Sequence, residues 1–133
     1  MHNVWEIFSV CNQIIQNLET VQRITRELIE DYSKNGCYYL EIRSSLKSYG
    51  ENTKQDYVNA IIETIKSCEP LYPQLAVRFL ISVNRERPLS QCEDEFTLAK
   101  HYIIDLKSPH VVGLDFSGNP SHADFEDFKM HIF

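Results

Sequence analysis

Three short apolar runs divide the chain at regular intervals, and each run ends in polar residues. The runs are CYYLEIRSS (37–45), LAVRFLISVNR (75–85) and VVGLDFSGNP (111–120), and their starts are about 35 to 38 residues apart. Apolar runs of this length, bounded by turn residues, are typical of buried strands. The pattern therefore predicts three strands whose carboxyl ends are polar.

The segments around these runs carry apolar residues three and four positions apart, the spacing of an amphipathic helix. Helices are expected over residues 3–16, 19–34, 53–68 and 90–106, with a short final helix from Ser121. Strands near 37, 75 and 110 that alternate with single helices form a repeating β-α-β-α-β unit.

Residues at the expected helix ends support these boundaries. Asn35-Gly36 is a stop signal for the second helix, and Thr53 is suited to cap the third. Ser90 and Glu93 have the spacing of a capping box for the fourth.

Repetition of β-α units implies a parallel sheet with right-handed crossovers. The sheet belongs either to an open doubly wound fold or to a piece of a (β/α)8 barrel. No strand is followed by a glycine-rich phosphate loop, and polar side chains follow the strands instead, as they do at barrel sites. We predict an α/β fold with residues 1–133 forming one domain, a partial (β/α)8 TIM barrel. A flavodoxin-like or Rossmann-like binding module remains the alternative.

The net charge of the chain limits the kinds of binding partner that are expected. The chain has 13 Lys and Arg against 19 Asp and Glu, a formal net charge of −6. Nucleic acid and anionic membrane surfaces need a clustered positive field, so neither is expected as a partner. A small anionic ligand held by local donors stays possible. No apolar run approaches the roughly 18 residues of a membrane span, and no secretory signal is recognisable at the N-terminus.

The four cysteines, Cys11, Cys37, Cys68 and Cys92, are 24 to 31 residues apart and form no CxxC pair. This spacing favours reduced, buried thiols over a disulfide framework. A cytoplasmic location is therefore expected.

The residues by themselves offer little catalytic chemistry. The five histidines show no HxH or HExxH spacing, so no metal site is predicted from them. Ser117, His122 and Asp115 could be assembled into a Ser-His-Asp set, but the nucleophile elbow GxSxG is missing. Glu41 and Arg43 share one face of the first strand by period two, which predicts a mutual or shared ion pair.

Two residues at the end of the third strand stand out. Asp115 is interpreted either as a ligand contact or as a buried acid held by loop amides. Gly118 is either a plain turn glycine or a place where the backbone approaches a flat ligand and offers an amide donor.

Taken together, YYLEIRSS (38–45), FLISVNR (79–85), VVGLDFSGNP (111–120) and WEIF (5–8) resemble the adenosine deaminase family. The resemblance covers nearly the whole chain in the same element order. Within the family, the chain is most similar to the branch that acts on N6-methyl-AMP.

The resemblance implies a (β/α)8 barrel hydrolase that removes ammonia or an amine from the purine 6-position, in nucleotide metabolism. In that mechanism zinc activates a water and a glutamate shuttles the proton. The implied ligand is a purine nucleoside monophosphate, either N6-methyl-AMP or an adenosine-like relative.

By position, the resemblance implies that the Gly118 amide faces the purine ring and that Trp5 and Phe8 form a hydrophobic lid. Spacing alone favours core or lid packing for Trp5 and Phe8. The other implied substrate contacts are Ser44, Ser45, Leu46, Lys47, Asn84 and Asn12. The chain departs from the branch pattern at Leu46, where proline is usual, and at Asn84, which is often aspartate.

The family's zinc-binding and catalytic residues match no position of this sequence. The chain is therefore expected to cover strands two to four of the eight-stranded barrel, to bind no zinc through its own residues and to be inactive alone. Its unpaired sheet edges favour self-association. The alternative function is a non-catalytic product that binds a purine nucleotide or a protein partner.

Overall fold

The structure is a computed structural model that describes residues 14–119, 121 and 128. The predicted site residues Asn12, Trp5 and Phe8 lie outside the described residues. So do the first predicted helix except its last residues, and the final predicted helix except Ser121 and Phe128. The elements are helix α2 (Leu18–Lys34), strand β1 (Tyr39–Ser45), helix α3 (Lys54–Cys68), strand β2 (Ala76–Asn84), a 3-10 turn (Leu89–Gln91), helix α4 (Glu93–Lys100), a π-helical turn (His101–Asp105) and strand β3 (Val111–Ser117).

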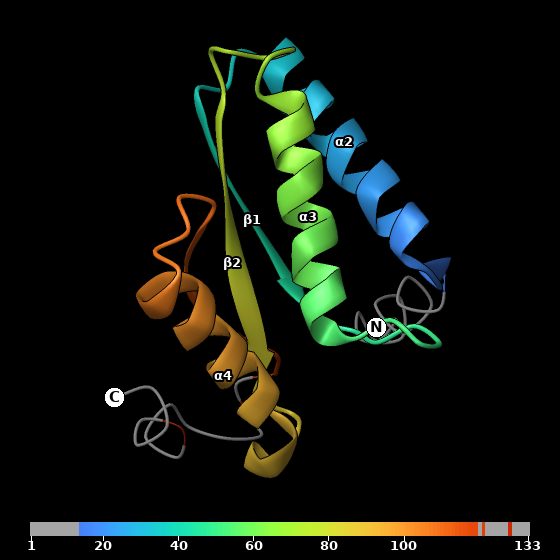
Figure 1. Ribbon diagram of the computed structural model, residues 1–133, viewed down its shortest axis with the longest axis vertical. Helices are drawn as coiled ribbons and strands as arrows, with labels where there is room; N and C mark the ends of the chain where they lie inside the picture. The colour runs from blue at the N-terminus through green and yellow to red at the C-terminus, as the bar shows by residue number, and fades with distance from the viewer. Residues whose placement is uncertain (1–13, 120, 122–127, 129–133) are drawn as a thin grey trace.

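The three strands form one parallel sheet in the order β1-β2-β3, as the sequence predicts. The helices cover one face of it. Alternate residues of β2, namely Val77, Phe79, Ile81 and Val83, are buried against them. In Figure 1, α2 and α3 lie side by side next to β1 and β2. Helix α4 lies on the flank of β2 that is away from α3, and it contacts β2 and β3.

The core between sheet and helices consists of aliphatic side chains. Ile29 of α2, and Ile61 and Ile65 of α3, are almost wholly buried with Phe79. Burying such a side chain contributes about 1.5–3 kcal/mol. This layer holds the strands in place and fixes where their carboxyl ends lie.

Helix ends follow the predicted signals in two cases and not in the third. Gly36 has φ +77° after α2, and Thr53 caps α3 in a capping box with Asp56. The predicted Ser90–Glu93 box is wrong. Ser90 lies in the 3-10 turn, α4 begins at Glu93, and no side chain caps it. The 3-10 turn donates Cys92 N–H to the Leu89 carbonyl and so supplies the entry to the helix instead.

Helix α4 is also shorter than its apolar stripe predicts. It continues as the π-helical turn, where Leu106 N–H donates to the His101 carbonyl over 2.9 Å. The wider turn rotates the following residues, and Leu106, predicted to face the core, is exposed.

The pairing of β2 with β3 contains a bulge. Phe79 pairs with Val111 and Leu80 with Gly113, so Val112 has no partner on β2. Because side chains alternate between faces along a strand, this extra residue reverses the alternation. Val111 faces the helices, and so do Leu114 and Phe116, whereas Asp115 and Ser117 lie on the opposite face.

Strand β1 is exposed on one face, although its apolar run is typical of a buried strand. Tyr39 is 55% exposed and Glu41 is exposed. The predicted Glu41–Arg43 pair is wrong: Glu41 accepts a hydrogen bond from the Tyr39 hydroxyl over 2.7 Å, and Arg43 pairs with Asp115 instead.

Cys37, Cys68 and Cys92 are free thiols, and two of them are buried. Within the described residues no helix is long and apolar enough to cross a membrane.

Candidate functional site

The carboxyl ends of the three strands meet at one edge of the sheet, called the rim below. The parallel register sets Ser45, Ser82 and Asp115 side by side, and two residues further along it pairs Asn84 with Ser117. Residues that are far apart in the sequence therefore converge, as the strand pattern predicts.

Asn84 and Gly118 are in contact at the rim. The Asn84 side-chain oxygen accepts the Glu86 N–H over 2.9 Å, which fixes the amide in a tight turn. Gly118 has φ +95°, and a Cβ built on it would overlap that Asn84 oxygen and lie 3.3 Å from Arg85 Cγ. Only glycine fits here without displacing Asn84. The turn glycine is thus also a site of close approach, but what it approaches here is protein.

Ser44 and Ser45 point to different places. The Ser44 hydroxyl lies 2.8 Å from the Tyr57 hydroxyl on α3, so it faces the helix layer. That buried Tyr57 hydroxyl has a raised pKa, chiefly because burial disfavours the phenolate. Ser45 alternates with Ser44 and pairs in register with Ser82, which places it on the open face of the sheet.

The next two predicted contacts follow β1 directly. Leu46 is only 3% exposed and packs in the hydrophobic core, so its side chain is a core residue and not a rim residue. Lys47 is partly buried, and burial lowers the pKa of its ammonium group. Of these two residues, only Lys47 offers a polar side chain in the loop after β1.

The open face of the sheet carries a polar network that the sequence pattern did not reveal. Asp115 accepts hydrogen bonds from Arg43 over 2.9 Å and from the Ser82 hydroxyl over 2.9 Å. The Ser82 and Ser117 hydroxyls lie 2.6 Å apart. Asp115 is therefore held by side chains of β1 and β2, and not by the loop amides considered as one alternative. The sequence signal that could have found the network is the alternation of Leu114 and Phe116 with Asp115 and Ser117, which places the two polar residues on one face of the strand.

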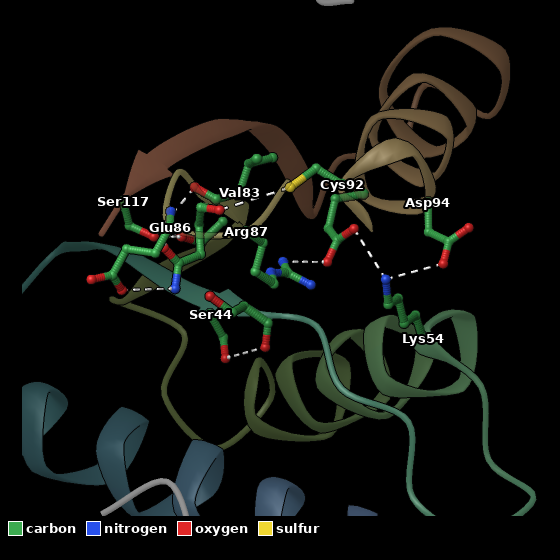
Figure 2. Close-up of polar contacts among 12 residues, drawn as sticks. Ser44, Lys54, Val83, Glu86, Arg87, Cys92, Asp94 and Ser117 are labelled. Atoms are coloured by element: carbon green, nitrogen blue, oxygen red, sulfur yellow. Dashed lines mark hydrogen bonds and ion pairs between the residues drawn. The ribbon is translucent and has the colours of Figure 1, made fainter. Parts of the chain in front are cut away.

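A second charged cluster lies behind the rim. The Glu95 carboxylate of α4 is fully buried, 2.7 Å from Arg87 Nη2 and 3.1 Å from Lys54 Nζ. Lys54 also pairs with Asp94 over 3.0 Å, as Figure 2 shows. A buried carboxylate is costly unless cations compensate it, and here two do.

The rim does not offer a metal centre from the described residues. No group of three or more His, Cys, Asp or Glu side chains among them could hold a metal ion. His110 sits at the amino end of β3 beside Glu69, at 3.0 Å, and His101 lies 3.6 Å from Asp105. Neither histidine is a rim residue, so the donor set of the described residues does not fit zinc.

Parallel strands with helices on one face, and polar side chains gathered at the strands' carboxyl ends, define an arc of a (β/α)8 barrel of the kind that carries enzyme sites. The family model for adenosine deaminase matches residues 1–133. The chain belongs to the adenosine deaminase family.

Comparison with individual proteins supports the same family assignment. The N6-methyl-AMP deaminase of Bos taurus is 32% identical over 127 residues, which are 92% of this chain and 35% of that protein. The crystal structure of Arabidopsis ADAL complexed with IMP superposes with a TM-score of 0.80 at 26% identity, covering 97% of this chain and 39% of that one. The chain therefore spans little more than a third of the length of the relatives it matches.

A more distant solved structure shares the fold. An amidohydrolase from Burkholderia ambifaria with bound Zn has a TM-score of 0.67 at 16% identity, covering 88% of this chain and 32% of that one. These likenesses confirm the predicted α/β fold and the partial barrel.

Proposed function

We propose that this chain forms part of the purine-nucleotide pocket of a deaminase that hydrolytically removes ammonia or an amine from the purine 6-position. One observation carries the proposal: Asn84 and Gly118 meet at the rim of a sheet that superposes on a relative solved with IMP. Because Gly118 carries no side chain, we propose that a flat ring approaches its backbone beside Asn84.

The ligand class we propose is a purine nucleoside monophosphate such as N6-methyl-AMP or its product IMP. The contacts proposed are those of Gly118, Asn84, Ser45 and Lys47. Ser44 and Leu46 are proposed only through their backbone, because their side chains face α3 and the core. Asn12, with Trp5 and Phe8 as a lid, stays a prediction from the sequence.

Catalysis is proposed to depend on zinc, as the zinc-bound amidohydrolase neighbour suggests. The described residues hold no metal group, so we expect the 133-residue chain by itself to bind ligand without turning it over. The three cysteines in the described part of the chain are free thiols, which supports a proposed reducing, cytoplasmic location.

The test is a calorimetric titration of the full chain with IMP, and with inosine and inorganic phosphate as competitors for the two halves of the ligand. We expect saturable IMP binding that Gly118→Ala weakens. Gly36→Ala is the matched control, because Gly36 also has positive φ but has nothing within 4 Å of the added Cβ and precedes β1 at the opposite end of the sheet.

Two results would count against the proposal. Absence of heat with IMP for a folded chain would remove the nucleotide-binding function. Release of methylamine from N6-methyl-AMP by the purified chain with zinc would contradict the expected lack of turnover. The alternative, a chain that binds a protein partner without a nucleotide, predicts no IMP heat at all.

A further inference from the structure

Glu95 joins two loops that leave the rim from neighbouring strands. Its Oε1 accepts from Arg87, which lies in the loop after β2, and its Oε2 accepts from Lys54, where the loop after β1 enters α3. One buried carboxylate therefore ties together the two connections that follow adjacent strands.

Arg87 carries this restraint directly to the rim. Its backbone N–H donates to the Asn84 carbonyl over 3.1 Å, while the Glu86 N–H holds the Asn84 side-chain oxygen over 2.9 Å. Residues 84–87 thus form one compact turn, called the Asn84 turn below. Its far end is anchored by the Glu95 ion pair.

The orientation of the Asn84 turn determines the local surface, because the Asn84 side chain is packed directly against the Gly118 backbone. The Asn84 side chain occupies the space where a Cβ of residue 118 would stand. A small rotation of the Asn84 turn would therefore change the surface that Asn84 and Gly118 present together.

We infer that Glu95 is a positioning residue for nucleotide binding: through Arg87 it sets the Asn84 turn against the Gly118 backbone. The inference rests on the proposed function for its ligand, and on the contacts of Glu95, Arg87 and Asn84 for its mechanism. Glu95 itself does not reach the rim, since its carboxylate is enclosed between Arg87 and Lys54.

The experiment measures two quantities separately: the rate of protease cleavage within the Asn84 turn, and the affinity of the chain for IMP. Trypsin cleaves after Arg85 within the turn, whereas Arg87 is protected by the following Pro88. We expect Glu95→Gln to raise cleavage at Arg85–Glu86 and to weaken IMP affinity about fivefold or more, as loss of about 1 kcal/mol of coupling implies. Arg87→Gln should do the same.

A double-mutant cycle separates positioning from general destabilisation. If Glu95 acts through Arg87, the Glu95→Gln/Arg87→Gln double variant should bind IMP no more weakly than the weaker single variant. Asp94→Asn is the matched control, because Asp94 is the preceding residue, pairs with the same Lys54 and is 72% exposed. It should leave both cleavage and affinity within about twofold of the wild type.

The outcomes are distinguishable from failure of the proposed function. Unchanged cleavage at Arg85 in a folded Glu95→Gln variant, or additive losses in the cycle, would overturn the positioning role. A wild-type chain that binds no IMP would refute the proposed function and with it the ligand half of the inference. The protease comparison would then decide alone whether Glu95 anchors the Asn84 turn.

Discussion

The backbone of Gly118 lies against the side-chain amide of Asn84, so that any Cβ at position 118 would occupy the place of the Asn84 oxygen. The two residues are 34 positions apart and come from different strand ends. Their contact makes the conformation of one depend on the size of the other.

This contact predicts a non-additive effect on stability. Gly118→Ala should lower the free energy of unfolding by about 2 kcal/mol, from positive φ and from displacing Asn84. Gly36→Ala, which meets no neighbour, should cost about 1 kcal/mol. In an Asn84→Ala background the cost of Gly118→Ala should fall toward that of Gly36→Ala, as urea unfolding would measure. Equal costs in both backgrounds would contradict the contact.

The polar network on the open face should contribute measurably to stability. Asp115→Ala leaves the Ser82 hydroxyl and Arg43 without their shared acceptor, and we expect a loss of about 1–3 kcal/mol. Glu27→Ala, which breaks the exposed Arg23–Glu27 pair on α2, should change the free energy of unfolding by less than about 1 kcal/mol. A loss as small for Asp115→Ala would show that the network is not stabilising.

The cap of α3 should make stability depend on acid. The Thr53 backbone N–H and hydroxyl donate to Asp56 and hold the pKa of its carboxyl below the ordinary 3.8. A depressed pKa gives stability that is present above pH 3.8 and is lost as pH falls through the lower folded value. The advantage of the wild type over Asp56→Asn in thermal unfolding should therefore shrink below pH 3.8. An advantage that stayed constant down to pH 2 would exclude this role of Asp56.

The edge of β1 should promote association between copies of the chain. Its outer side has no partner strand among the described residues, and Tyr39 on it is exposed. Lysine on an edge strand opposes pairing with another strand, so Tyr39→Lys should reduce any self-association seen by sedimentation velocity. Tyr32→Lys is the control, since Tyr32 is an exposed tyrosine on α2, away from the edge. Equal reduction by both variants would point to general charge effects instead.

Much of the fold was predictable because strands and helices differ in their apolar periodicity. The positions of β1, β2 and β3, the Thr53 cap and the Gly36 stop follow from local rules that act within a few residues. The parallel arrangement follows from the alternation of strands and helices. The meeting of Asn84 and Gly118 then follows, because parallel strands end at the same edge.

Several of the errors share a physical origin, because they needed knowledge of a neighbour that is distant in sequence. Arg43 pairs with Asp115 on β3 and not with Glu41 two residues away. Leu46 is buried in the core although it directly follows a polar strand end. Likewise, burial of Glu95 depends on two loops that local pattern cannot bring together. Apolar periodicity predicts which face of a strand or helix a side chain occupies, but it does not predict which residue that side chain contacts.

The unpaired Val112 makes β3 one residue longer than its pairing with β2 requires. Because Phe79 pairs with Val111 and Leu80 with Gly113, deleting Val112 would leave both pairs in register and restore regular pleating. Asp115 and Ser117 would keep the face that they share with Ser82. Deleting Leu114 instead would pair Asp115 with Ile81 and turn its carboxylate toward the helices, so a single-codon loss there should be far more damaging than the loss of Val112.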